Sequence, residues 1–143
     1  MTKAPRIRSL HHIGVAVASL KEAVPRWTDE FGLELDSIAE VPSERVRVAI
    51  LRAGGARIEL LEPMAEDSLI ARFLAKKGPG IHHLAFGVED CAVQIGALKA
   101  LGAPLLDEEP RPGAHGCRVA FVHPRYLGGA LAEFVEDPSD DRA

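Results

Sequence analysis

One short sequence occurs twice in the chain, and this repeat limits what the chain can fold into. Residues 10–17 read Leu-His-His-Ile-Gly-Val-Ala-Val, and 71 positions later residues 81–88 read Ile-His-His-Leu-Ala-Phe-Gly-Val. Each copy is a short apolar run that contains a histidine pair and precedes a helical pattern. Such internal similarity is typical of a fold built from two copies of one supersecondary unit.

The first copy predicts a β-α-β-β-β unit. Residues 11–17 are short and apolar, as in a strand buried on both faces. Ser19 and Glu22 form the capping-box pattern of a helix that should end at Gly32. Pro25 should kink this helix, because proline lacks the backbone N–H. The unit is completed by predicted strands at residues 34–41, 46–51 and 57–61.

A second unit follows a predicted linker helix. This helix spans residues 67–77, with Asp67 as its N-cap and a Gly-Pro-Gly stop after it. A loop rich in proline and glycine is expected at residues 109–116, and the acidic tail from Glu136 is expected to fray. The remaining elements of the second unit are predicted strands at residues 81–88, 104–107, 117–123 and 129–135 and a helix at about residues 90–101.

Composition restricts the classes of function. The chain has 143 residues, is 47% hydrophobic and carries a formal net charge of −4, which argues against nucleic acid or an anionic membrane as a partner. Cys91 and Cys117 form no CxxC pair, so we expect neither a disulfide scaffold nor a cysteine zinc site. No signal-peptide core or membrane-spanning run is visible. We therefore expect a cytoplasmic globular protein.

The repeat also places two histidines and two glutamates at equivalent positions. His83 follows His12 by 71 residues, and Glu133 follows Glu59 by 74, because the second hairpin turn is three residues longer. Alone, a histidine on an apolar strand is more often a core residue, and a glutamate is more often exposed. Their recurrence at matching places instead favours a mixed nitrogen and oxygen site for a divalent metal. The neighbouring histidines, His11 and His82, should point the other way and be structural.

Neither half can bury both faces of a four-stranded sheet alone, so the halves should pack around a pseudo-twofold axis. We predict an α+β fold in which two βαβββ modules form one curved mixed sheet around the metal site. The predicted single domain spans residues 8–137, with modules at about 10–63 and 81–136 and a linker helix at about 67–78.

These modules, with His and Glu at these places, resemble the vicinal oxygen chelate (glyoxalase/bleomycin resistance) superfamily. Within it, the chain is similar to the methylmalonyl-CoA epimerase family from about Leu10 to Glu136. The loop Glu-Pro-Arg-Pro-Gly-Ala-His-Gly and the linker helix are the most specific features. The similar segments are residues 58–63, 67–74, 80–83, 107–116, 123–125 and 128–129.

The resemblance implies a divalent metal held by His12, Glu59, His83 and Glu133, with two positions left open for substrate oxygens. Cobalt or manganese is expected, with nickel, zinc or magnesium as alternatives. It also implies epimerisation of (2R)- and (2S)-methylmalonyl-CoA by abstraction of the α-proton. The resulting enediolate would be stabilised by the metal acting as a Lewis acid.

Epimerisation needs two acid/base groups, one on each side of the reacting carbon. Glu133 is a candidate for one of them. Some family members are similar in placing a second glutamate on the third strand, where this chain has Val48. Glu44, Glu59 or a metal-bound water remain as alternatives for the second group.

The substrate would be a coenzyme A thioester, whose phosphates require a local basic patch. Arg72, Lys76 and Lys77 on the linker helix and Arg111 in the Pro-rich loop are candidates, and His115 is a candidate substrate contact. Lys76 and Lys77 fit equally well as a solvated helix end that favours the helix dipole. A homodimer is a further expectation, because an exposed strand edge can pair with another subunit.

Two other readings use the same scaffold. The first alternative is another enzyme of the superfamily, such as a lactoylglutathione lyase or a dioxygenase. An iron dioxygenase favours two histidines and one carboxylate, whereas Glu59 adds a fourth ligand here. The second alternative is a non-enzymatic small-molecule binding protein, although binding proteins of this superfamily usually lack the metal ligands. Fold alone does not decide among these functions.

Overall fold

A computed structural model describes residues 3–140 of the chain. The backbone divides into two compact units, one of residues 12–82 and one that joins residues 3–11 to residues 83–140. The division falls inside the first and fifth strands, so the N-terminal segment belongs to the unit of the second module.

The unit of residues 12–82 contains a mixed four-stranded sheet in the order β2-β3-β4-β1. The pairs β2/β3 and β3/β4 are antiparallel, and β4/β1 is parallel. Its elements are β1 (Ser9–Ala16), α1 (Leu20–Pro25), η1 (Arg26–Glu30), β2 (Glu34–Val41), β3 (Val46–Ala53), β4 (Ala56–Pro63) and α2 (Leu69–Lys77).

The other unit repeats this arrangement with the order β6-β7-β8-β5. Again the last pair, β8/β5, is parallel and the others are antiparallel. The predicted α+β fold of two βαβββ modules with mixed sheets is therefore confirmed. The elements are β5 (Gly80–Gly87), α3 (Cys91–Ala100), β6 (Arg111–Pro112), η2 (Ala114–Gly116), β7 (Arg118–Val122), η3 (Pro124–Leu127) and β8 (Ala132–Glu136).

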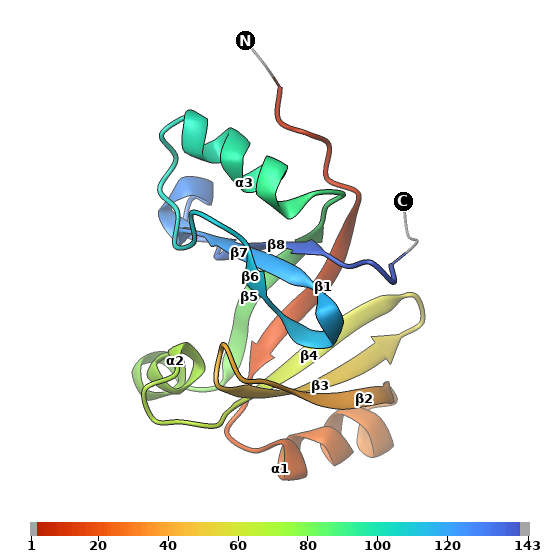
Figure 1. Cartoon of the computed structure of the whole chain (residues 1–143). Coiled ribbons are helices and arrows are strands. Elements are labelled where there is room, and N and C mark those ends of the chain that lie inside the picture. The colour runs from red at the N-terminus through yellow and green to blue at the C-terminus, as the bar shows by residue number, and fades with distance from the viewer. Residues whose placement is uncertain (1–2, 141–143) are drawn as a thin grey trace. The chain divides into compact units, whose positions relative to one another are not determined.

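In each unit a helix covers one face of the sheet (Figure 1). Leu20 of α1 packs with Leu51 and Leu60 of the first sheet, and Ile95 of α3 packs with Phe134 of the second. Because successive strand residues point to opposite faces, the residues between these core positions point away from the helix. This alternation sends the glutamates next to Leu60 and Phe134 to the opposite face of each sheet.

The first backbone N–H of α1 and that of α3 each bond to a glutamate near the end of the last strand of the same module. Glu62 Oε1 accepts a hydrogen bond from the backbone N–H of Leu20 at 3.0 Å, and Glu136 Oε1 accepts one from Cys91 at 2.8 Å. A carboxylate is favourable there because the first N–H groups of a helix lack partners within it. Glu136 is thus fixed in β8, so the predicted fraying does not begin at this residue. Residues 141–143 of the predicted tail lie outside the described residues.

The first helix changes its type at Pro25, where a kink was expected. The α-helix ends at Pro25, and a π-helical turn follows, in which the N–H of Phe31 bonds to the carbonyl of Arg26 at 2.9 Å. Proline donates no backbone hydrogen bond, so the regular α-helical pattern is interrupted at this point.

Two local predictions are wrong. The N-cap of α2 is Ser68, whose side chain accepts from the N–H of Ala71 at 3.1 Å, and not Asp67. The strand expected at residues 104–107 is reduced to one bridge at Leu105, and the strand β6 lies instead inside the expected loop. At Asp107 the backbone N–H still bonds to the carbonyl of Phe121, but the Asp107 side chain, and not a backbone carbonyl, accepts the N–H of Phe121.

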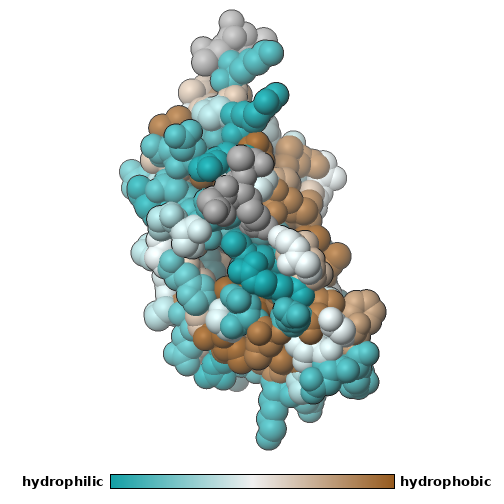
Figure 2. Space-filling model, turned by 90° about the vertical axis from the view of Figure 1, so that its right-hand side faces the viewer, coloured by the Kyte–Doolittle hydropathy of each residue, from teal (hydrophilic) through white to brown (hydrophobic). Residues whose placement is uncertain are grey.

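Apolar residues reach the surface between charged ones on the face shown in Figure 2. Exposed examples in the described chain include Phe31, Leu69, Ile81 and Leu101. No helix within residues 3–140 is both long and apolar enough to cross a membrane.

Candidate functional site

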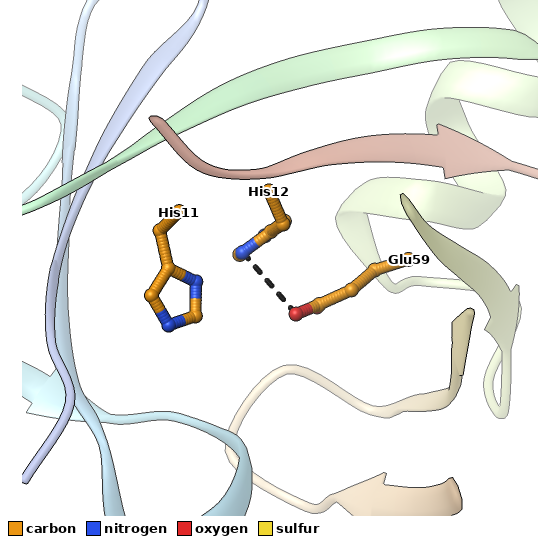
Figure 3. Close-up of side chains that lie close together, drawn as sticks. All are labelled: His11, His12 and Glu59. Carbon is orange, nitrogen blue, oxygen red and sulfur yellow. Dashed lines mark ion pairs between the residues drawn. The ribbon is translucent and has the colours of Figure 1, made fainter. Parts of the chain in front are cut away.

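Two of the predicted site residues, His12 and Glu59, contact each other within the unit of residues 12–82. Gly14 of β1 lies opposite Glu59 of β4, and His12 shares the face of Gly14 because it is two residues away. The two side chains point toward each other, with His12 Nδ1 3.2 Å from Glu59 Oε2 (Figure 3). Both are buried, at 6% and 10% side-chain exposure.

The other two predicted site residues, His83 and Glu133, contact each other in the other unit by the same geometry. Ala85 of β5 lies opposite Glu133 of β8, so a small residue again leaves room beside the histidine. His83 Nε2 lies 3.2 Å from Glu133 Oε1, and the two side chains are 5% and 6% exposed. In each unit the structure thus places the histidine that the repeat singled out beside the glutamate of the same module.

The donor atoms and their spacing fit a divalent metal. Neighbouring ligands of an octahedral ion, each about 2.1 Å from the metal, are about 3 Å apart. Each His–Glu pair has a separation of 3.2 Å. Imidazole nitrogen with carboxylate oxygen is also a donor set that suits divalent transition metals. A carboxylate buried this deeply needs a compensating positive group, which the imidazolium or a metal can supply.

The surroundings of the two pairs differ. Opposite Glu59 on the neighbouring strand stands Ile50, whereas Phe121 stands opposite Glu133. The Phe121 ring lies edge to face with the His83 ring, with centroids 5.3 Å apart and planes at 88°. The second pair therefore has an aromatic neighbour at the place where the first has an aliphatic one.

The histidines expected to be structural contact other groups. His11 Nε2 lies 2.8 Å from Asp137 Oδ2 and 3.8 Å from Asp140 Oδ2, and the His82 ring packs on Phe73 at 4.9 Å. Burial raises the pKa of Asp137, but hydrogen bonds from His11 and Ser139 outweigh it and lower the pKa below its ordinary value.

Asp137 and Asp140 were not foreseen from the sequence. With His11 they form a set of metal-type donors whose atoms lie within 4.8 Å of one another. The acidic tail indicated charge but no partner for it, because the partner histidine is 126 residues away.

The candidate substrate residues divide between the two units. Lys76 and Lys77 lie in the exposed last turn of α2, with Lys77 Nζ 6.0 Å from the Phe73 ring. Arg111 lies in β6 and His115 in η2, both just before β7. His115 is exposed and adopts the left-handed conformation, with φ of 54°.

Val48, where some family members carry a glutamate, and the alternative Glu44 lie in and just before β3. Val48 is buried in β3 opposite Leu61, and Glu44 lies in the turn before this strand, where its N–H bonds to the carbonyl of Val41 at 3.0 Å. Burial, followed by the nearby Glu136, raises the pKa of Cys91 to about 12. This thiol is thus a poor metal ligand or nucleophile at neutral pH.

Comparison with known proteins gives a consistent result. Residues 11–121 match the family model described as the Glyoxalase/Bleomycin resistance protein/Dioxygenase superfamily. The chain is 40% identical over 131 residues to the uncharacterized protein YqjC of Bacillus subtilis (strain 168), covering 92% of this chain and 94% of the relative. It is 38% identical over 132 residues to the ethylmalonyl-CoA/methylmalonyl-CoA epimerase of Cereibacter sphaeroides, covering 91% and 98%.

Among solved structures, the chain is similar to a methylmalonyl-CoA epimerase in complex with methylmalonyl-CoA and NH4+. The TM-score is 0.88 at 33% identity, and the alignment covers 94% of this chain and 97% of that chain. The similarity to these epimerases that the Pro-rich loop and the linker helix indicated is therefore confirmed.

Proposed function

Because the chain belongs to the Glyoxalase/Bleomycin resistance protein/Dioxygenase superfamily, we propose that it is a divalent-metal-dependent epimerase of methylmalonyl-CoA. The observation that carries this proposal is the pair of equivalent buried His–Glu contacts, each at 3.2 Å. The choice of reaction is supported by two similar proteins that are named as epimerases of methylmalonyl-CoA and that align with this chain over nearly their whole length.

In this proposal one metal ion is held by both pairs, that is by His12, Glu59, His83 and Glu133. Cobalt or manganese is the expected ion, with nickel, zinc or magnesium as alternatives. When bound, such an ion supplies Lewis-acid stabilisation of the negative charge that develops on the substrate oxygens. The four side chains, all buried, would also keep water from the charged intermediate.

The proton transfers are assigned to the two glutamates. A proton must leave one side of the α-carbon and return on the other, so two acid/base groups are needed. Glu59 and Glu133 are related by the repeat, and a carboxylate that directs one oxygen to its histidine keeps a second oxygen for a proton. We assign one face of the α-carbon to each of them, in preference to Glu44.

Substrate binding is assigned to four residues. Lys76, Lys77 and Arg111 carry positive charges suited to the anionic coenzyme A portion. His115 follows Arg111 by four residues in the segment before β7. A cytoplasmic location and a homodimer complete the proposal.

Exchange of the α-proton with deuterated water tests the reaction. Purified protein loaded with cobalt should incorporate deuterium into methylmalonyl-CoA, and a chelator should stop this incorporation. Ethylmalonyl-CoA should be assayed in parallel, because one similar protein is named for both substrates. A metal-loaded protein that exchanges neither substrate would contradict the epimerase and leave another activity of the superfamily.

A further inference from the structure

Asp107 is outside the set of predicted site residues, yet its carboxylate joins two parts of the second unit. Its Oδ2 accepts the backbone N–H of Phe121 at 2.8 Å, and its Oδ1 accepts Nε–H of Arg111 at 3.1 Å. Its own N–H donates to the carbonyl of Phe121 at 3.1 Å. Asp107 therefore fixes Phe121 at both its backbone groups and holds Arg111 next to it.

Arg111 in turn contacts the Phe121 ring. The centre of its guanidinium lies 5.4 Å from the ring centroid, within the range of a cation–π interaction. With side-chain exposures of 25% for Arg111 and 20% for Asp107, the pair is partly shielded from water. A shielded and hydrogen-bonded ion pair holds its geometry better than an exposed one.

The held ring contacts His83 directly. Its edge-to-face packing on the imidazole at 5.3 Å restricts rotation of the His83 side chain, since rotation would bring the two rings into collision. His83 Nε2 is directed at Glu133 in this orientation. Metal-binding histidines are normally oriented by groups behind them, and a loss of this support weakens metal binding.

We propose that Asp107 is a positioning residue that acts through Arg111 and Phe121 to hold the imidazole of His83 in its ligand orientation. The proposal rests on the proposed function in one respect, the role of His83 as a metal ligand. The orientation itself is a property of the metal-free protein and can be measured without substrate.

The test uses nuclear magnetic resonance of the metal-free full-length protein. The ring current of Phe121 should displace the His83 ring-proton signals, and Phe121→Leu should give their undisplaced position. Asp107→Ala and Arg111→Met should move these signals toward the Phe121→Leu value, whereas Arg111→Lys should keep them near wild type. Asp36→Asn is the matched control, because it removes another Asp–Arg pair, with Arg52 at 3.3 Å, in the first unit.

Metal binding provides the second readout. Asp107→Ala should lower the affinity for Co²⁺ about tenfold and change the cobalt absorption spectrum, whereas Asp36→Asn should change neither. Asp107→Asn should have a Co²⁺ affinity between those of Asp107→Ala and Asp36→Asn. Its amide oxygen can still accept the Phe121 N–H, but its amide nitrogen cannot pair with Arg111.

The outcomes separate this proposal from the proposed function. Unchanged His83 signals in folded Asp107→Ala or in folded Arg111→Met would overturn the positioning role, even if the wild type exchanges the α-proton of methylmalonyl-CoA. Displaced signals together with a wild-type protein that fails to exchange would overturn the function alone. Arg111→Met keeps the test decisive if Asp107→Ala does not fold.

Discussion

The two modules share their donor residues and differ in what supports them. In the first, β2 is an eight-residue strand, and Ile50 stands opposite Glu59. In the second, the corresponding strand β6 has two residues, and Phe121, Arg111 and Asp107 stand together on the site face and its loop. The repeat has thus kept the His–Glu pair while the segment between helix and hairpin has changed.

This difference is what an unsymmetrical substrate requires. The proposed substrate places a thioester on one side of the reacting carbon and a carboxylate on the other. Equivalent donor residues in the two modules are sufficient to hold a metal. Binding a thioester and a carboxylate needs different side chains around each of these two groups. We therefore expect substitutions in the shared elements to have similar effects in both modules, and substitutions in the unshared elements to have unlike effects.

The largest effect should come from the glutamates. Glu133→Gln and Glu59→Gln should each lower epimerisation by roughly 10²- to 10⁴-fold, because each removes one acid/base group. Each variant should keep α-proton exchange with one epimer only, and the two variants should keep opposite epimers. Glu66→Gln, an exposed glutamate on the loop before α2, is the control. Full activity in Glu133→Gln would remove Glu133 from the mechanism.

The paired core residues should show similar losses of stability. Leu60 and Phe134 stand at equivalent places in the two sheets, and both are buried under a helix. Truncation to alanine should lower the free energy of unfolding by about 2–5 kcal/mol for Leu60 and about 3–5 kcal/mol for Phe134. Urea denaturation measures both. A loss below 1 kcal/mol at either position would contradict the packing described for that module.

The two helix-starting carboxylates give a smaller, matched effect. Glu62→Ala and Glu136→Ala should each lower stability by about 1–2 kcal/mol, because each leaves a helix N–H without its acceptor. Glu62 should cost more, since it also pairs with Arg47 at 3.1 Å. Thermal unfolding followed by circular dichroism checks the order. The reverse order would show that the Arg47 pair contributes nothing.

The smallest expected loss of stability concerns the contact of His11 with Asp137. Because the pKa of Asp137 is lowered by folding, its contribution is present above the unfolded pKa of about 3.9 and is lost as pH falls through the lower folded-state pKa. Asp137→Asn should thus lower stability by about 1 kcal/mol at pH 7 and by less at pH 3. A constant difference for Asp137→Asn would exclude an ionic contribution.

The sequence predicted the shared features well, for a physical reason. Local spacing fixes which residues share a strand face, so the repeat was enough to single out His12 with His83 and Glu59 with Glu133 as equivalent positions. Which glutamate each histidine contacts came only from the structure. The supports were not predictable in this way. Asp107 seemed part of a strand because its side-chain bond to Phe121, 14 residues away, has no signature in spacing. The contact of His11 with Asp137 likewise depends on chain folding across the length of the protein.

Cobalt titration tests most directly the central claim that both His–Glu pairs hold one ion. Wild-type protein should bind one Co²⁺ per chain, with one absorption spectrum that saturates at one equivalent. His12→Ala and His83→Ala should each weaken this binding strongly, because each removes a ligand from the same ion. Binding of two ions per chain, or undiminished affinity in either variant, would contradict the claim.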